Sequence, residues 1–106
     1  MCIVKYNMKN IFNFKSKVWL WSGENPWHFI SVDKVTSEKI KKIQLGKLRR
    51  GWGAVKVKVL IGKSSWTTSI FPDKRSGTYL LPLKLEIRKK EGIMASDMVK
   101  VKLELI

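Results

Sequence analysis

The sequence predicts one all-β domain, a small closed or pseudo-closed β-barrel of about six strands with two short helices. At 106 residues the chain has the length of a single domain, spanning residues 1–106, with residues 1–9 as a loosely attached N-terminal segment. Apolar residues alternate with polar ones over several short segments, which is the two-residue period of strands with one buried face. These segments are too short and too polar on one face for a parallel α/β sheet.

The first predicted strand covers residues 11–21, where the side chains alternate in character. One face is apolar and is expected to face the core: Phe12, Phe14, Val18 and Leu20. The opposite face is basic and aromatic: Lys15, Lys17, Trp19 and Trp21. A turn at residues 22–26, which ends in Pro26, leads into a second short strand at residues 27–32.

A helix is predicted at residues 37–45, where the period of the apolar residues changes. Ser37 is its expected N-cap, and Gly46 stands where a left-handed C-terminal residue belongs. The next residues, 47–53, are expected to form a basic loop.

The clearest hairpin is predicted at residues 54–71. Gly62 and Lys63 can form a type II′ turn, which takes glycine at its first central position. This turn sets the register of the two strands, pairing Ile61 with Ser64, Val59 with Trp66, Val57 with Thr68, and Val55 with Ile70. The turn and the apolar pattern place the same residues on one face, so they agree on the register.

The C-terminal part is predicted as a strand at residues 78–81, a helix at residues 83–91 that Gly92 ends, and a last strand that Asp97 opens. The last strand alternates between inward-facing Val99, Val101, Leu103 and Leu105 and outward-facing Lys100, Lys102 and Glu104. The predicted core combines inward residues of several strands: Phe12, Phe14, Val55, Val57, Val59, Trp66, Ile70, Val99, Val101 and Leu103.

Several segments, in order along the chain, carry a resemblance to a known family. They are Trp19-Leu20-Trp21 with Trp27-His28-Phe29, Gly51-Trp52-Gly53-Ala54-Val55, residues 66–74, Tyr79-Leu80-Leu81-Pro82-Leu83-Lys84, residues 87–92, and Asp97-Met98-Val99. Over about residues 10–105 the chain resembles the domain-of-unknown-function family nineteen-oh-five. The resemblance implies a small β-barrel similar to the split barrels of swapped-hairpin transcription factors, and it supplies no agreed activity and no catalytic residues. Ser96 departs from the family, which usually has glycine there, and this leaves the tightness of that turn open.

Catalytic chemistry and cofactors are not expected from these residues. His28 is the only histidine and Cys2 the only cysteine, whereas a metal site needs several ligands at suitable spacing. The serines and threonines within residues 64–69 lack a base tied to them by sequence, and Asp73 and Asp97 stand where turns use Asx hydrogen bonds. We therefore expect a non-enzymatic protein in which His28 is an ordinary strand residue.

The chain is expected in the cytoplasm, without contact to membranes. A single cysteine cannot form an intramolecular disulfide, which fits a reducing compartment. Polar residues interrupt the N-terminus before a signal-peptide core can form, and the apolar runs are too short to span a membrane.

Positive charge is the main clue to a partner, because 22 Lys and Arg against 8 Asp and Glu leave a net charge of +14. Such a charge attracts nucleic acid, since lysine and arginine bind phosphates and an exposed tryptophan stacks on bases. The candidate nucleic-acid-binding residues are Lys15, Lys17, Arg49, Arg50, Trp52, Lys56, Lys58, Lys74, Arg75, Lys100 and Lys102.

The leading hypothesis is a non-enzymatic binding module that neutralises phosphates of nucleic acid with little base readout. The alternative is a barrel that binds a small ligand, another protein or a second copy of itself, with the charge serving solubility. Outward lysines also protect strand edges from aggregation, and Trp52 can equally plug the barrel. Basic residues on one continuous face favour nucleic acid, whereas an even scatter beside an apolar groove favours the alternative.

Overall fold

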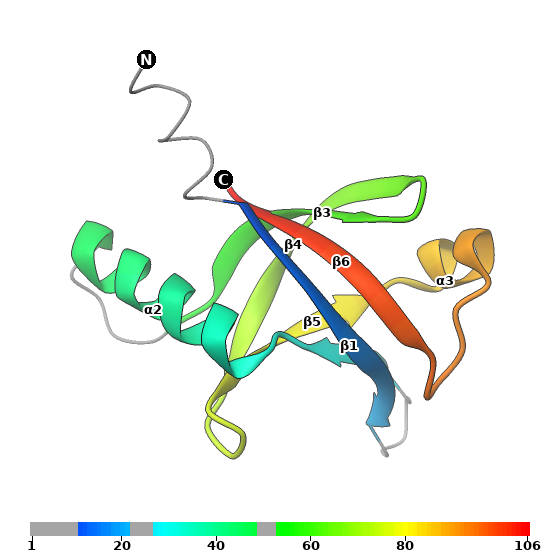
Figure 1. Ribbon diagram of the computed structural model, residues 1–106, viewed down its shortest axis with the longest axis horizontal. Helices are drawn as coiled ribbons and strands as arrows, with labels where there is room; N and C mark the ends of the chain where they lie inside the picture. Colours follow the sequence, from blue (N-terminus) through cyan, green and yellow to red (C-terminus); the bar gives the residue numbers. More distant parts are fainter. Residues whose placement is uncertain (1–10, 22–26, 49–52) are drawn as a thin grey trace.

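The computed structural model describes residues 11–21, 27–48 and 53–106, which fold into a closed antiparallel barrel with the strand order β1-β2-β5-β4-β3-β6 (Figure 1). Along the chain the elements are β1 (Ile11–Trp21), β2 (Trp27–Ser31), α2 (Lys34–Leu48), β3 (Val55–Ile61), β4 (Ser64–Asp73), β5 (Thr78–Leu83), α3 (Leu85–Glu91) and β6 (Met98–Leu105). This architecture confirms the predicted small all-β barrel with two short helices. The expected N-terminal segment at residues 1–9 lies outside the described part of the chain.

Strand β1 joins the two halves of the barrel. Its first part, from Ile11 to Lys17, pairs with β6, and its last part, from Val18 to Trp21, pairs with β2. The predicted alternation holds for most of the strand, but Leu20, expected in the core, is 46% exposed. Leu20 is the next residue after the buried Val18 on the inward face of β1, and at this point the strand extends past the end of the core.

The β3–β4 hairpin has the predicted register. Its pairs are those expected from the turn: Ile61 with Ser64, Val59 with Trp66, Val57 with Thr68, and Val55 with Ile70. Gly62 has a positive φ of 58°, and a Cβ at this position would collide with the carboxylate of Glu91. That carboxylate accepts hydrogen bonds from Ser64 Oγ at 2.6 Å and from the Lys63 N–H at 3.3 Å, so the end of α3 holds the hairpin turn.

Helix α2 is longer than predicted at both ends. It begins at Lys34, because the carboxylate of Asp33 accepts the Thr36 N–H at 2.8 Å and so caps the helix four residues before the predicted Ser37. Ser37 is buried instead, where its hydroxyl donates to the Val32 carbonyl and accepts the Tyr79 N–H, both at 3.1 Å. This hydroxyl connects α2 to the chain leaving β2 and to β5.

The C-terminal end of α2 also differs from the prediction. The helix continues through Gly46 to Leu48, because a glycine inside a helix costs only about 1 kcal/mol and does not compel the helix to end. The first two residues of the predicted basic loop, Lys47 and Leu48, therefore belong to α2. Residues 49–52 lie outside the described part of the chain.

The elements after the hairpin differ from the prediction only at their ends. Strand β5 extends to Leu83, a buried residue that pairs with His28, so α3 begins two residues after its expected start. Gly92 ends α3 in the left-handed conformation, with φ of 64°, as predicted. The inward and outward residues of β6 alternate as expected.

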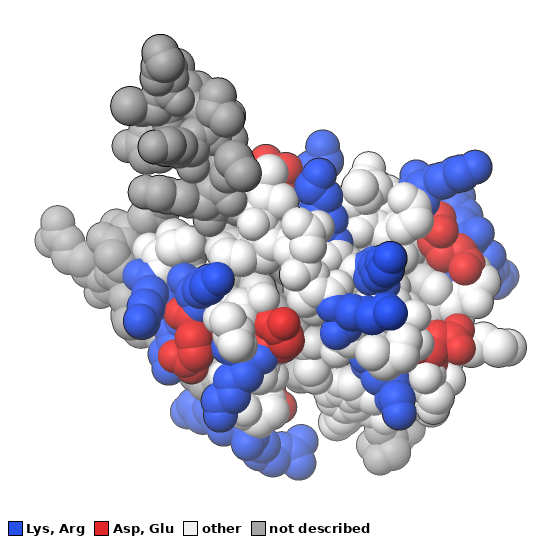
Figure 2. Space-filling view, viewed as in Figure 1, with Lys and Arg blue, Asp and Glu red and all other residues white. Residues whose placement is uncertain are grey.

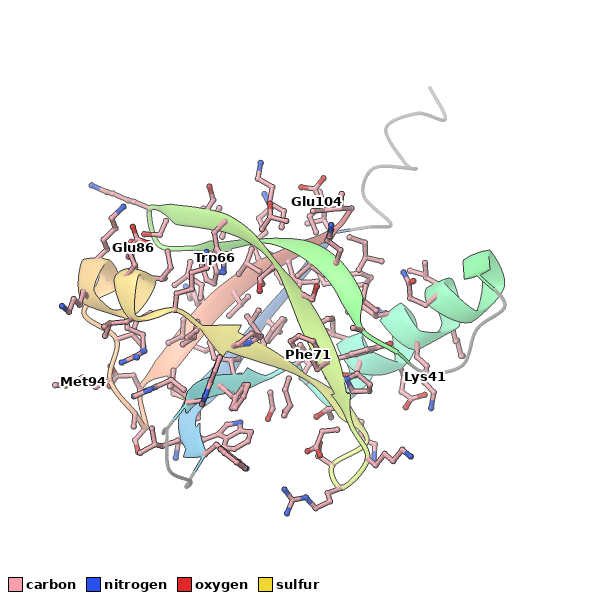
Figure 3. The ribbon with its side chains drawn as sticks, turned by 180° about the vertical axis from the view of Figure 1, so that it is seen from behind. Lys41, Trp66, Phe71, Glu86, Met94 and Glu104 are labelled. Carbon is pink, nitrogen blue, oxygen red and sulfur yellow. The ribbon has the colours of Figure 1, made fainter. Side chains whose placement is uncertain are left out.

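The core inside the barrel is almost entirely aliphatic. Its fully buried members include Val57 and Val59 of β3, Ile70 of β4 and Leu103 of β6, all of which were predicted. Phe12 and Trp66, also predicted, are only partly buried and pack against its margin. Trp66 lies on the side of the barrel nearest α3 (Figure 3).

The turn before β6 contains Ser96 at the position where the family usually has glycine. This residue adopts a positive φ of 79°, which is a strained conformation for a side chain other than glycine or asparagine. Its N–H donates to the Val18 carbonyl at 2.8 Å, and the Asp97 carboxylate accepts the Met94 N–H at 2.8 Å. The turn is therefore closed despite the missing glycine, and Ser96 carries the conformational cost.

Replacing Ser96 by glycine should raise the free energy of unfolding by about 0.5–1 kcal/mol. Removing the left-handed strain gains about 1–2 kcal/mol, and the added freedom of glycine in the unfolded chain returns part of that gain. Urea denaturation of the wild type and the Ser96→Gly variant measures the difference. Ser96→Ala is the control, since it keeps the strain and should show no gain. A less stable glycine variant would contradict this account.

Candidate functional site

Basic side chains lie on the outer side of three neighbouring strands, β1, β6 and β3. They are exposed lysines that alternate with buried core residues, and we call this surface the lysine face: Lys15, Lys17, Lys56, Lys58, Lys100 and Lys102. The barrel order brings these strands side by side, although they are far apart in the sequence. Figure 2 shows several Lys and Arg side chains over β1 and β6 in the middle of this view, with uncharged residues between them.

The pairing of strands brings lysines of the lysine face directly together. Lys15 of β1 is the cross-strand partner of Lys100 of β6, and like charges in this position are destabilising. Lys102 lies between Asn13 and Leu60, which do not balance its charge. Glu104, opposite Lys58, is an acidic residue within this surface. The face therefore keeps positive charges close together at a cost in stability.

The remaining predicted residues do not join the lysine face. Lys74 and Arg75 are exposed in the turn between β4 and β5, where Asp73 accepts hydrogen bonds from the Arg75 N–H at 3.4 Å and from Ser76 Oγ at 2.9 Å. Asp73 thus forms the side-chain hydrogen bonds of a turn, as predicted from the sequence. The predicted residues Arg49, Arg50 and Trp52 lie outside the described part of the chain.

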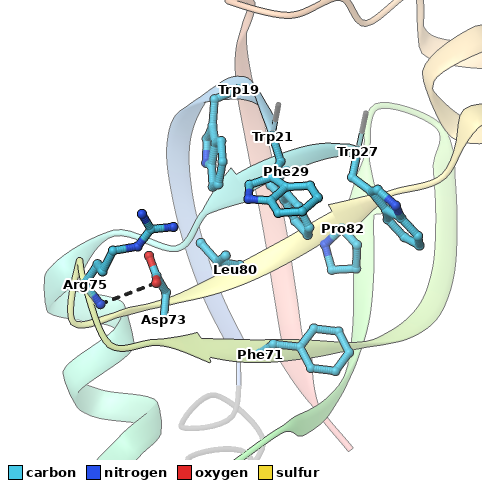
Figure 4. Close-up of a pocket in the computed structure, with 9 residues that line it drawn as sticks. All are labelled: Trp19, Trp21, Trp27, Phe29, Phe71, Asp73, Arg75, Leu80 and Pro82. Carbon is cyan, nitrogen blue, oxygen red and sulfur yellow. Dashed lines mark hydrogen bonds between the residues drawn. The ribbon is translucent and has the colours of Figure 1, made fainter. Parts of the chain in front are cut away.

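A second surface, the aromatic groove, lies on the outer side of β1, β2, β5 and β4 (Figure 4). It has a volume of about 440 Å³, within the range of ligand sites, and is lined by Trp19, Trp21, Trp27, Phe29, Phe71, Asp73, Arg75, Leu80 and Pro82. Three of its rings are strongly exposed: Trp21 at 45%, Trp27 at 54% and Phe71 at 46%. In Figure 4, Phe71 lies on the other side of Leu80 and Pro82 from the tryptophans.

Strand register assembles the aromatic groove. Trp19 pairs with Phe29, their ring centroids 5.3 Å apart, and the ring of Trp27 stacks on the same phenylalanine with centroids 6.3 Å apart. Trp19 is fixed further, because its Nε1–H donates to Ser31 Oγ at 2.9 Å. Across the sheet, Pro82 pairs with Phe29 and continues the apolar surface onto β5. The rings nearest β1 are therefore held in place by one another.

Only part of this groove is predicted from the sequence. Trp19 and Trp21 are expected on an outward face, but the sequence does not connect them with Phe29, Phe71 or Pro82. The local signal was present, since Phe71 follows the inward Ile70 and must point outward. The missing information was the order of strands, which brings β5 and β4 beside β2.

The lysine face and the aromatic groove meet on one strand. From Lys15 onward, the outward residues of β1 are Lys15, Lys17, Trp19 and Trp21. Successive outward residues on a strand are about 7 Å apart, so the outer surface changes from charged at Lys17 to aromatic at Trp19 over about that distance. Basic and aromatic side chains thus follow one another on the outer side of β1.

His28, the only histidine, lies on β2 on the same side as the buried Ile30. Its Nδ1 is buried and has no hydrogen-bond partner among the described residues. Burial lowers the pKa of His28 below its ordinary value of 6.5, and the positive charge of Arg88 lowers it further. A neutral imidazole at the inner margin of the barrel suits a structural residue.

Among residues 11–21, 27–48 and 53–106, no three His, Cys, Asp or Glu side chains gather as a metal ion would require. The described helices are not long and apolar enough to cross a membrane. Of the candidate nucleophiles, Ser64 is bonded to Glu91 in the contact that holds the hairpin turn.

Comparison with known proteins gives a family but no activity. Residues 14–103 match the family described as Domain of unknown function (DUF1905). No curated protein matches the chain. The family match includes all six strands in whole or in part, so it covers both the lysine face and the aromatic groove.

The lowered pKa of His28 predicts a pH-dependent stability. As the pH falls below 6.5, the unfolded chain takes up the proton before the folded chain does, so the free energy of unfolding decreases. His28→Gln cannot gain this proton and should lose this part of the slope. Urea denaturation of both proteins at several pH values around 6.5 tests the difference. Parallel pH profiles would show that His28 is not the group responsible.

Proposed function

We propose, for a chain that belongs to the DUF1905 family, a non-enzymatic function in binding nucleic acid through the lysine face. The observation that carries the proposal is that Lys15 and Lys100 lie directly opposite each other. Lys102 follows two residues further along β6, on the same outer face. A stable barrel does not need like charges opposite each other, because they destabilise strand pairing. A polyanion laid over β1 and β6 would relieve this repulsion.

The mechanism is neutralisation of phosphates. Each lysine that contacts a phosphate releases condensed counterions from the nucleic acid, and this release drives binding without regard to sequence. Contacts to phosphate position a nucleic acid but carry no base information. The lysine face therefore supports binding to many sequences with little discrimination between them.

The alternative is an interaction barrel in which the charge of +14 serves only solubility. Solubility requires charged residues on the surface, but it does not require that they face one another across a strand pair. Lysines gathered on β1, β6 and β3 favour an anionic partner over a general solubility role.

Replacing Lys15, Lys100 and Lys102 together by glutamine should weaken binding to nucleic acid by about 10-fold or more at low salt. The slope of log affinity against log salt should become shallower by about 2, at about 0.7 for each phosphate contact on a single strand. Fluorescence anisotropy with labelled random-sequence DNA and RNA measures both quantities. The fold should persist, because all three side chains are exposed.

The matched control replaces Lys34, Lys39 and Lys42, three exposed lysines of α2, by glutamine. It removes the same charge from another element and should change affinity and slope much less. Equal effects of the two triple variants would show that net charge acts alone, without a defined surface. If the wild type binds no nucleic acid even at low salt, the interaction-barrel alternative replaces this proposal.

A further inference from the structure

We infer that the aromatic groove stacks the unpaired bases of a single strand whose phosphates lie on the lysine face. This inference rests on the proposed function and makes it more specific, because it assigns single-stranded nucleic acid as the substrate class. Base pairs hide the flat faces of bases inside a duplex, whereas a single strand exposes them. A stacking groove therefore selects single strands without reading their sequence.

The groove has the chemistry that stacking requires. Trp27 and Phe71 leave about half of their surface in solvent, at 54% and 46% exposed, on two different strands. Exposed aromatic rings on a small barrel are the groups on which successive bases stack in proteins that bind single strands. Trp19 is held by Ser31 and packed on Phe29, so this part of the groove is ordered before any ligand arrives.

Charge and continuity identify the occupant. Along β1 the groove begins at Trp19, one outward position past Lys17, and Arg75 and Asp73 line it near the β4–β5 turn. An occupant that spans this surface must carry both negative charge and flat apolar rings. Single-stranded nucleic acid has both in every nucleotide. A proline-rich peptide would use the aromatic rings but would gain nothing from the lysine face.

The test compares ligands that separate base from phosphate. The first is a strand of about 16 thymidines, at the upper end of the site sizes known for small barrels. The second is an abasic strand of the same length, which keeps the phosphates and lacks the bases. The third is the corresponding thymidine–adenine duplex, and the fourth is decaproline. Binding is measured by anisotropy or by intrinsic tryptophan fluorescence at one fixed salt concentration, with a salt series for the two single strands.

The thymidine strand should bind about tenfold or more tightly than the abasic strand and should quench tryptophan fluorescence. Trp27→Ala and Phe71→Ala should each weaken thymidine binding about tenfold, leave abasic binding unchanged and leave the salt slope unchanged. The matched control is Met94→Ala, which removes a side chain that is 72% exposed and lies apart from Phe71 (Figure 3). It should change none of these values.

Each contrary result has a separate meaning. Equal affinity for thymidine and abasic strands, with no effect of Trp27→Ala or Phe71→Ala, overturns the stacking groove while the lysine face stands. Preference for the duplex overturns it in the same way. If the groove variants lose decaproline binding and keep thymidine binding, the groove is a peptide site and the inference is wrong. If the wild type binds none of the nucleic acids, the inference and the proposed function fall together.

Discussion

The closure of the barrel by strand β1 is the constraint on which the rest of the structure depends. This strand pairs with β6 over its first part and with β2 over its last part. Neither β6 nor β2 therefore has an unpaired edge on the side of β1. The strand must keep one phase of alternation across the change of partner, since a slip of one residue would turn Phe14 and Val18 out of the core. The same phase sends Lys17 and Trp19 outward in sequence, so the alternation that buries the core also joins two kinds of outer surface.

Closure also separates the residues that hold the barrel together from those on its outer surface. The inner side is filled mainly by aliphatic residues, with Phe14 and Tyr79 among them, and the groups that hold the ends of the barrel are buried or partly buried polar side chains. Ser37 connects α2 to β5, and Glu91 holds the β3–β4 turn. The lysine face and the aromatic groove lie wholly on the other side of the strands. Residues there can be exchanged without opening the core, which is why a surface that is unfavourable by itself, such as Lys15 opposite Lys100, is tolerated.

Prediction from the sequence succeeded where two local signals agreed and failed where a contact between distant segments decided the outcome. The register of the β3–β4 hairpin followed from Gly62 and the apolar alternation together. Ser37 was a reasonable N-cap by local pattern, but its hydroxyl is used by Tyr79, 42 residues away, and Asp33 caps the helix instead. The aromatic groove was found only in part for the same reason. Its rings come from strands whose neighbours are set by barrel order, and local periodicity carries no information about that order.

The lysine pair between β1 and β6 makes this protein respond to its ionic surroundings in two opposite ways. At physiological salt the Debye length is about 8 Å, longer than the roughly 5 Å between the Cβ atoms of directly opposed residues, so salt does not fully screen the repulsion between Lys15 and Lys100. Added salt screens it and strengthens the barrel, while the same salt competes with any bound polyanion. A bound polyanion also relieves this repulsion. A melting temperature that rises with salt in the free protein should therefore rise less, or fall, with salt once a polyanion occupies the surface, because salt weakens its binding.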